Sequence, residues 1–189
     1  MITFDIKDLY VNVPIDETIN IIKTKLQQNN NRQITHQIIA MLKTVLQQNY
    51  FAFQQNIYQP KQGISMGSHI SGIVAEIFLQ NYEDNYMKQF LETKSILYYT
   101  RYVDDILIIY DETKINPQII NTQINKIHDS MKFTPTREEH NTINYLDLTI
   151  RRHYNKLIID IYRKPTATDT FSNHPIEQKM ATFRSYLNP

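Results

Sequence analysis

The sequence predicts an α+β fold, in which an antiparallel sheet has helices packed on one face. Three features of the sequence support this prediction. Short apolar runs such as 2–6 and 106–110 are typical of strands. Longer segments such as 15–26 repeat their apolar residues at helical spacing. These patterns alternate irregularly, with hairpins as well as helical crossovers, and that arrangement favours a sheet covered by helices.

The composition is typical of a globular protein of about one domain. The 189 residues are 41% hydrophobic and 21% charged, which excludes a disordered chain and a collagen-like fibre. The net charge of +1 argues against a polycation that coats nucleic acid by charge alone. The absence of cysteine excludes disulfides and thiolate chemistry. With no signal peptide and no apolar run near the ~20 residues of a membrane span, we expect an intracellular protein without membrane partners.

The first half of the chain is expected to hold a strand, two helices and a hairpin. The apolar run 2–6 predicts the strand. Pro14 and the acidic Asp16 and Glu17 mark the start of the first helix, because acidic side chains stabilise a helix N-terminus. The amide-rich stretch 27–31 predicts a loop after that helix. The other elements are a hairpin over 50–53 and 57–58, and a second helix whose apolar face carries Ile34, Ile38, Met41, Leu42, Val45 and Leu46.

The second half begins with a loop over 60–68 near which all three glycines gather, since Gly63, Gly67 and Gly72 fall within ten residues. Apolar spacing predicts a helix from 68 or 69 to 90, and Pro117 opens another that reaches 131. The apolar and alternating runs predict strands over 96–103, 106–110, 133–138, 143–150 and 157–163.

Adjacent carboxylates lie between two of the predicted strands. Asp104 and Asp105 would form the turn, and Asp5 ends the first strand. Each has an ordinary interpretation, because Asp is favoured in turns and at strand ends. If strand 2–6 lies beside the 96–110 hairpin, however, three carboxylates converge, and they cannot all stay ionised without a partner. Hard divalent cations such as Mg²⁺ take carboxylate oxygens as ligands, so this pattern predicts a metal site.

Three ordered motifs resemble those of reverse transcriptases. Phe4-Asp5-Ile6-Lys7-Asp8-Leu9-Tyr10 resembles motif A, Gln62-Gly63-Ile64-Ser65-Met66-Gly67-Ser68 resembles motif B, and Tyr102-Val103-Asp104-Asp105 resembles the YxDD turn of motif C. Their order and spacing are those of a polymerase palm. Downstream, Tyr145–Ile150, Tyr162–Asp169 and Asn173-His174-Pro175 resemble signatures of the Penelope-like retroelements within that family. The resemblance covers nearly the whole chain.

The resemblance implies an RNA-directed DNA polymerase palm with a nuclear location. Asp5, Asp104 and Asp105 would be the catalytic metal ligands, joined by the carbonyl of Ile6, for two Mg²⁺ ions or Mn²⁺. The partners would be an RNA template, a DNA primer and deoxynucleoside triphosphates. The residues implied at the nucleotide are Asp8, Tyr10 as the gate against a 2′-hydroxyl, Gln62 and Gly63.

The basic tail and Tyr102 are expected to contact nucleic acid. Arg151, Arg152, Arg163 and Lys164 are interleaved with tyrosines, which suits phosphate contact and primer binding. A solvated basic face is the alternative. We expect residues 1–163 to form the palm and residues 164–189 to begin a thumb or connection.

The chain departs from the family pattern in three respects. His69 stands where these motifs usually have proline. The motif D lysine, the expected proton donor to pyrophosphate, has two candidates in Lys126 and Lys132. No fingers region is recognisable before motif A, so we expect a palm fragment of a longer element. The alternatives are a remnant without catalytic activity that binds nucleic acid or a partner, and an RNA-dependent RNA polymerase palm, which Tyr10 and Tyr102 disfavour.

Overall fold

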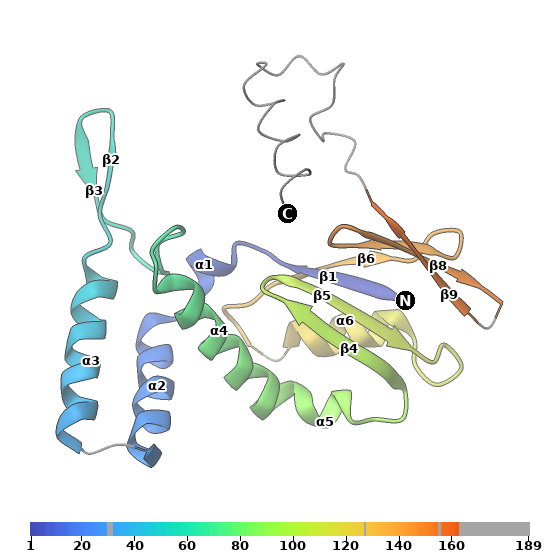
Figure 1. The fold of residues 1–189 in the computed structure, drawn as a ribbon, viewed down its shortest axis with the longest axis horizontal. Coiled ribbons are helices and arrows are strands. Elements are labelled where there is room, and N and C mark those ends of the chain that lie inside the picture. Colours follow the sequence, from blue (N-terminus) through green and yellow to red (C-terminus); the bar gives the residue numbers. More distant parts are fainter. Residues whose placement is uncertain (30–31, 127, 155, 163–189) are drawn as a thin grey trace. The chain divides into compact units, whose positions relative to one another are not determined.

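The structure, a computed structural model, describes residues 1–29, 32–126, 128–154 and 156–162 (Figure 1). It divides into two compact units, Met1–Glu139 and His140–Pro189. Arg163, Lys164 and the predicted thumb segment 164–189 lie outside the described residues. Within the described ranges, every helix is too short or too polar to traverse a bilayer.

A four-stranded antiparallel sheet forms the centre of the first unit. Its strands are β1 (Ile2–Ile6), β4 (Ile96–Tyr102), β5 (Asp105–Tyr110) and β6 (Phe133–Arg137), in the order β4-β5-β1-β6. In β1, Ile2, Phe4 and Ile6 are buried and alternate with more exposed side chains. That alternation gives the sheet one apolar face, because successive side chains of a strand point to opposite sides.

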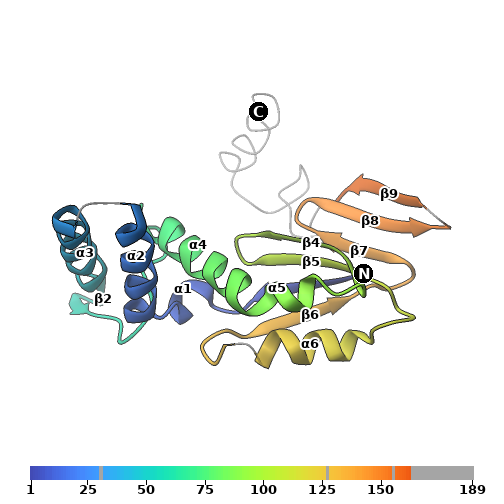
Figure 2. The same cartoon turned by 90° about the horizontal axis from the view of Figure 1, so that it is seen from below.

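Helices cover this apolar face (Figure 2). They are α4 (Ser71–Tyr82), continued by a π-helical turn η1 (Glu83–Met87) and α5 (Lys88–Leu91), and α6 (Pro117–Lys126). Phe78, Tyr82 and Ile124 belong to the same buried cluster as Phe4 of the sheet. The Tyr82 hydroxyl also donates to the Ile124 carbonyl at 3.0 Å, which links α4 to α6. The predicted α+β class, with helices on one face of an antiparallel sheet, is confirmed.

Between β1 and α4 the chain forms the short helix α1 (Leu9–Asn12), the helices α2 (Ile15–Asn29) and α3 (Arg32–Gln47), and the hairpin of β2 (Phe51–Phe53) and β3 (Asn56–Tyr58). Helix α2 packs against both α3 and α4. The predicted loop over 27–31 is wrong for residues 27–29, which continue α2, because glutamine is a good helix former.

The predicted apolar face of α3 is also wrong in part. The buried residues are Thr35, Ile39 and Leu46. Four residues of the predicted face, Ile34, Ile38, Met41 and Val45, are instead exposed. Helix α3 has apolar residues over more than one side, so spacing alone did not distinguish the side that packs on α2.

The described part of the second unit holds a three-stranded antiparallel sheet. Its strands are β7 (Thr142–Tyr145), β8 (Leu148–His153) and β9 (Lys156–Ile161), in that order. The single strand predicted over 143–150 is therefore two strands. The break falls at Leu146, whose φ of 54° is left-handed, and at Asp147. A leucine rarely adopts this conformation, so its side chain gave no sign of a turn.

Two further boundaries differ from the predictions. The helix expected from 68 or 69 to 90 begins at Ser71 and contains the π-helical turn. The helix from Pro117 ends at Lys126 in the described chain and not at 131. Both differences move helix ends by a few residues and leave the elements in their predicted order.

Candidate functional site

The pairing of β1 with β5 brings carboxylates from distant parts of the sequence together. Asp5 is the register partner of Asp105, and the Ile6 amide donates to the Asp104 carbonyl at 3.0 Å. Cα atoms of such paired residues lie about 5 Å apart in an antiparallel ladder. Asp8 follows β1 directly. We call Asp5, Asp8, Asp104 and Asp105 the acidic edge. Asp105 lies within β5 and pairs with Tyr102, so the predicted Asp104–Asp105 turn is shifted to Val103–Asp104.

The surroundings of Asp5 at the acidic edge disfavour its ionised form. The pKa of Asp5 is raised, first by partial burial and then by the negative charges of Asp104 and Asp8. Among the described residues, no three His, Cys, Asp or Glu side chains converge into a metal cluster. The donor set nevertheless fits a hard divalent cation, because it consists of carboxylate oxygens whose repulsion a cation would relieve.

The turn that carries Asp104 has a strained backbone. Val103 has a φ of 54°, in the left-handed region. A β-branched residue with positive φ is a genuine outlier and costs about 1–3 kcal/mol. A two-residue hairpin turn with positive φ at its first position normally has glycine there. A strained backbone conformation persists only where the surrounding structure holds it in place, and such conformations are frequent at functional sites.

Helix α1 follows the acidic edge and carries Tyr10. Asp8 precedes the helix with a φ of 51°, and its carbonyl accepts the amides of Val11 and Asn12 at 3.1 Å each. Asp8 is exposed, whereas Tyr10 is half-buried and packs against the core. The fold therefore restrains the ring of Tyr10 by packing.

Gly63 locks the glycine-containing loop onto α1. The Ile64 amide donates to the Tyr10 carbonyl at 2.8 Å. A Cβ atom at Gly63 would lie 2.4 Å from the Val11 carbonyl oxygen, and the φ of Gly63 is +77°. Glycine is therefore required by both space and backbone conformation. The sequence interpretation, close approach of a base pair, stays a prediction; the described contact at Gly63 is with the protein's own backbone.

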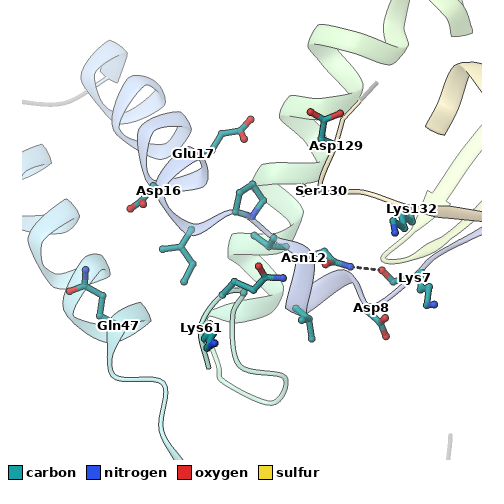
Figure 3. A pocket seen from close by; sticks show the side chains of 16 residues that line it. Lys7, Asp8, Asn12, Asp16, Glu17, Gln47, Lys61, Asp129, Ser130 and Lys132 are labelled. Carbon is teal, nitrogen blue, oxygen red and sulfur yellow. Dashed lines mark hydrogen bonds between the residues drawn. The ribbon is translucent and has the colours of Figure 1, made fainter. Parts of the chain in front are cut away.

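A pocket of about 870 Å³ lies beside α1 and this loop (Figure 3). Asp8, Gln62 and Gly63 line it, together with Lys7, Lys61 and Lys132. Figure 3 shows Lys7, Asp8 and Lys132 gathered at one end of the pocket, with Asp16 and Gln47 at the opposite end. The Lys7 amide donates to the Lys132 carbonyl at 2.9 Å. Lysine ammonium groups at one end of a pocket suit the binding of phosphate.

A family model described as "Reverse transcriptase (RNA-dependent DNA polymerase)" matches residues 1–138, which is nearly the whole first unit. The chain belongs to the reverse transcriptase family. At the level of this family, the activity is that of a nucleotidyltransferase that makes DNA on RNA. No curated protein matches the chain.

Solved telomerases share the fold of this reverse transcriptase. An apo telomerase from Candida tropicalis, truncated from its C-terminal domain, has a TM-score of 0.60 and 18% identity over 84% of this chain. A telomerase from Candida albicans, in complex with a TWJ fragment of telomeric RNA, has a TM-score of 0.66 and 14% identity over 99%. An apo telomerase from Candida tropicalis has a TM-score of 0.61 and 16% identity over 79%. The chain spans 35%, 35% and 30% of these structures, or about a third of their length.

The remaining predicted site residues fall into three groups. Tyr102 ends β4 and is 64% exposed. Arg151 and Arg152 lie in β8 of the second unit and are exposed. Of the two lysines considered for motif D, Lys126 ends α6, whereas Lys132 lines the pocket.

The sequence reasoning missed three basic residues that the structure makes prominent. Lys7 and Lys61 line the pocket. Arg101 is 7% exposed at its side chain and makes ion pairs with two glutamates. Lys7 lies within motif A, Lys61 directly precedes motif B, and Arg101 directly precedes motif C. A scan for charges within and beside the motifs would have found all three.

Proposed function

We propose that the chain is the palm of an RNA-directed DNA polymerase, which extends the 3′-hydroxyl of a DNA primer on an RNA template with deoxynucleoside triphosphates. The pairing of Asp5 with Asp105 in the sheet carries this proposal, because it lies within the segment that matches the family. The raised pKa of Asp5, caused by burial and neighbouring carboxylates, supports a site that takes a cation.

The proposed ligands of two Mg²⁺ ions, or of Mn²⁺, are the carboxylates of Asp5, Asp104 and Asp105 with the carbonyl of Ile6. When bound, two such ions stabilise the attacking and the leaving oxygen of a phosphoryl transfer. The primer 3′-oxygen bonds to the α-phosphorus as the bond from that phosphorus to pyrophosphate breaks. The 3′-hydroxyl gives its proton to solvent water, and pyrophosphate gains a proton, for which Lys132, the motif D candidate that lines the pocket, is the proposed donor.

Selection of the nucleotide is proposed for the pocket and for α1. Asp8, Gln62 and Gly63 would border the incoming nucleotide, and all three line the pocket. The ring of Tyr10 would collide with a 2′-hydroxyl and so exclude ribonucleotides. Packing of Tyr10 on the core supports this role, because a restrained ring discriminates better than a mobile one.

Nucleic-acid contact is proposed for Tyr102 and for the basic residues Arg151, Arg152, Arg163 and Lys164. The exposed ring of Tyr102 offers a surface for base stacking, and exposed arginines suit phosphates. The proposal also includes a palm over 1–163 with the start of a thumb or connection at 164–189, a Penelope-like origin and a nuclear location. These last points rest on the motif resemblance alone.

Primer extension tests the proposal. The protein that contains this chain should extend a DNA primer on an RNA template, and Asp104→Asn should reduce the rate about 100-fold or more, because metal ligation supplies several kcal/mol of transition-state stabilisation. Asp111→Asn is the matched control, since Asp111 follows the same strand β5 at its other end. Equal extension by wild type and Asp104→Asn would refute the metal-site assignment.

Two outcomes would favour the other candidates. Tight binding of a primer–template duplex without extension by any variant would indicate a nucleic-acid-binding remnant. Extension with ribonucleotides in preference to deoxyribonucleotides would indicate an RNA polymerase. Tyr10→Ala should raise ribonucleotide use, and unchanged selectivity would remove the proposed role of Tyr10.

A further inference from the structure

We propose that Arg101 is a positioning residue, which holds the strained Val103–Asp104 turn in its active geometry by tying it to α4. This inference rests on the proposed function of Asp104 and Asp105 as metal ligands. Arg101 lies in β4 and pairs with Ile106 of β5. Paired residues of an antiparallel ladder face the same side of a sheet, and Ile106 belongs to the core beneath α4.

All five N–H donors of the Arg101 guanidinium have acceptors. Two bonds go to the Glu76 carboxylate at 2.9 and 3.0 Å, and two go to the Glu83 carboxylate at 2.7 and 3.1 Å. The fifth goes from Nη1 to the Val103 carbonyl at 3.1 Å. Only a guanidinium supplies five donors in a rigid planar fork. We call Arg101, Glu76 and Glu83 the arginine clamp.

Both carboxylates of the arginine clamp come from one helical face. Glu76 lies in α4 and Glu83 opens η1. The Tyr99 hydroxyl donates to Glu83 as well. The hydrogen bond from Arg101 lowers the pKa of Glu76 despite its partial burial. Burial works to lower the pKa of Arg101, but the hydrogen bonds and charges of both glutamates raise it, so the guanidinium keeps its charge.

The contact with Val103 gives the arginine clamp its functional meaning. Val103 has the strained φ of 54° and directly precedes Asp104. The two carbonyls of the turn are held from two directions: Arg101 binds that of Val103, and the Ile6 amide binds that of Asp104 at 3.0 Å. If Arg101 served only to join β4 to α4, its bonds to the two glutamates would be enough. The additional bond from Nη1 to the Val103 carbonyl connects it to the turn. The fifth bond links the helix that follows the glycine loop to the proposed metal ligands.

Arg101→Lys and Arg101→Gln test the inference. Lysine keeps the positive charge but cannot match five acceptors, so both variants should release the turn. Displacing a group that orients metal ligands costs about 10–100-fold in metal affinity or activity. We expect that loss in kcat and in the Mg²⁺ concentration for half-maximal extension, with the KM for nucleotide changed less than about threefold. Mn²⁺ binding, measured by electron paramagnetic resonance of the free ion, should weaken in parallel.

Tyr99→Phe is the matched control. It removes the hydroxyl that contacts Glu83 but leaves every Arg101 bond in place. It should therefore change the thermal stability without changing the Mg²⁺ concentration needed for half-maximal extension. A variant of Arg101 that folds, and whose kcat and metal dependence equal those of wild type, would overturn the inference.

Amide hydrogen exchange tests the positioning even if the protein does not polymerise. The Ile6 amide reports the turn, because its acceptor is the Asp104 carbonyl. In Arg101→Lys its protection should fall about tenfold more than that of the Ile64 amide, whose acceptor is Tyr10. Equal changes at both amides would overturn the inference and leave the proposed function standing. If the wild-type protein does not extend primers, but Arg101→Lys selectively loses protection at the Ile6 amide, the proposed function would be refuted and the positioning role of Arg101 would stand.

Discussion

The acidic edge and the arginine clamp lie in one compact unit, yet the pKa values of one carboxyl group in each, Asp5 and Glu76, shift in opposite directions. The pKa of Asp5 is raised, by burial and by the charges of Asp104 and Asp8. The pKa of Glu76 is lowered, chiefly by the hydrogen bond from Arg101. In the clamp the fold supplies its own cation. At the acidic edge, burial and the charges of Asp104 and Asp8 disfavour the ionised form of Asp5, which suits a cation from solution.

The two clusters are also held in place by different means. Side-chain pairing orders the arginine clamp, because a single guanidinium donates five hydrogen bonds, four of them to carboxylates. Backbone hydrogen bonds order the acidic edge, from the amides of Ile6 and Lys7 to the carbonyls of Asp104 and Lys132. The comparison therefore separates carboxylates that build the fold from carboxylates for which we propose a role in the reaction.

Breaking the arginine clamp should have the largest effect on stability. Arg101→Met would leave Glu76 and Glu83 facing each other without their cation. Removal of one partner from a buried ion pair costs 3–5 kcal/mol, and since Glu76 is 43% exposed we expect about 3 kcal/mol. Urea unfolding would measure the loss.

A triple variant provides the control for the arginine clamp. Adding Glu76→Gln and Glu83→Gln to Arg101→Met removes the unpaired charges and should recover about half of the lost stability. No recovery would mean that packing of the arginine stem, and not charge, dominates the clamp.

Substitutions in and after the glycine-containing loop test whether backbone contacts hold α1 beside the acidic edge. Gly63→Ala would bring a Cβ to 2.4 Å from the Val11 carbonyl oxygen at a φ of +77°, which should cost about 2 kcal/mol and displace α1. Gly72→Ala is the control, since nothing lies within 4 Å and helix α4 favours alanine, so it should stabilise by up to about 1 kcal/mol. Thermal unfolding compares them, and similar Tm values would contradict the proposed lock.

The sequence predicted the fold class and the elements that carry the acidic edge, because these depend on local patterns. The apolar run before Asp5 and the apolar run after Asp105 identify β1 and β5, and the sheet pairs them. Other features depend on contacts across the fold. Nothing adjacent to Arg101 indicates that Glu76 and Glu83 accept its hydrogen bonds, since they lie on a different element.

Helix α3 and the β7–β8 turn show the same limit. Ile38 and Ile39 are equally apolar, and only packing on α2 decides that Ile39 is the buried one. Leu146 occupies a left-handed turn that leucine disfavours, so the pairing of β7 with β8 must determine its conformation. Side-chain preference cannot reveal a backbone conformation that tertiary pairing imposes.

Relieving the acidic edge should stabilise the protein while abolishing its activity. Asp5→Asn removes a charge that its neighbours disfavour, and we expect Tm at pH 7 to rise by about 2 °C. Because the pKa of folded Asp5 is raised, the wild-type penalty exists above that pKa and disappears as pH falls through it. The gain should therefore shrink in acid, and Mg²⁺ should raise the wild-type Tm more than that of the variant. A loss of stability at pH 7 would mean that Asp5 is paired within the fold.

The smallest expected effect is at a carboxylate that is paired with an exposed lysine. Asp111 follows β5, and hydrogen bonds from Lys114 and Thr113 lower its pKa to about 2. Like Glu76 it is paired with a cation, but its partner Lys114 is 51% exposed whereas Arg101 is 7% exposed. Ion pairs with an exposed partner contribute little, so Asp111→Asn should shift Tm by no more than about 2 °C. Because the folded pKa lies below the usual value of 3.8, this contribution is present above pH 4 and is lost as pH falls toward 2. Primer extension should be unchanged. A Tm loss as large as that of Arg101→Met would contradict this expectation. It would show that pairing with a cation is enough to make a carboxylate structural, whether or not that cation is buried.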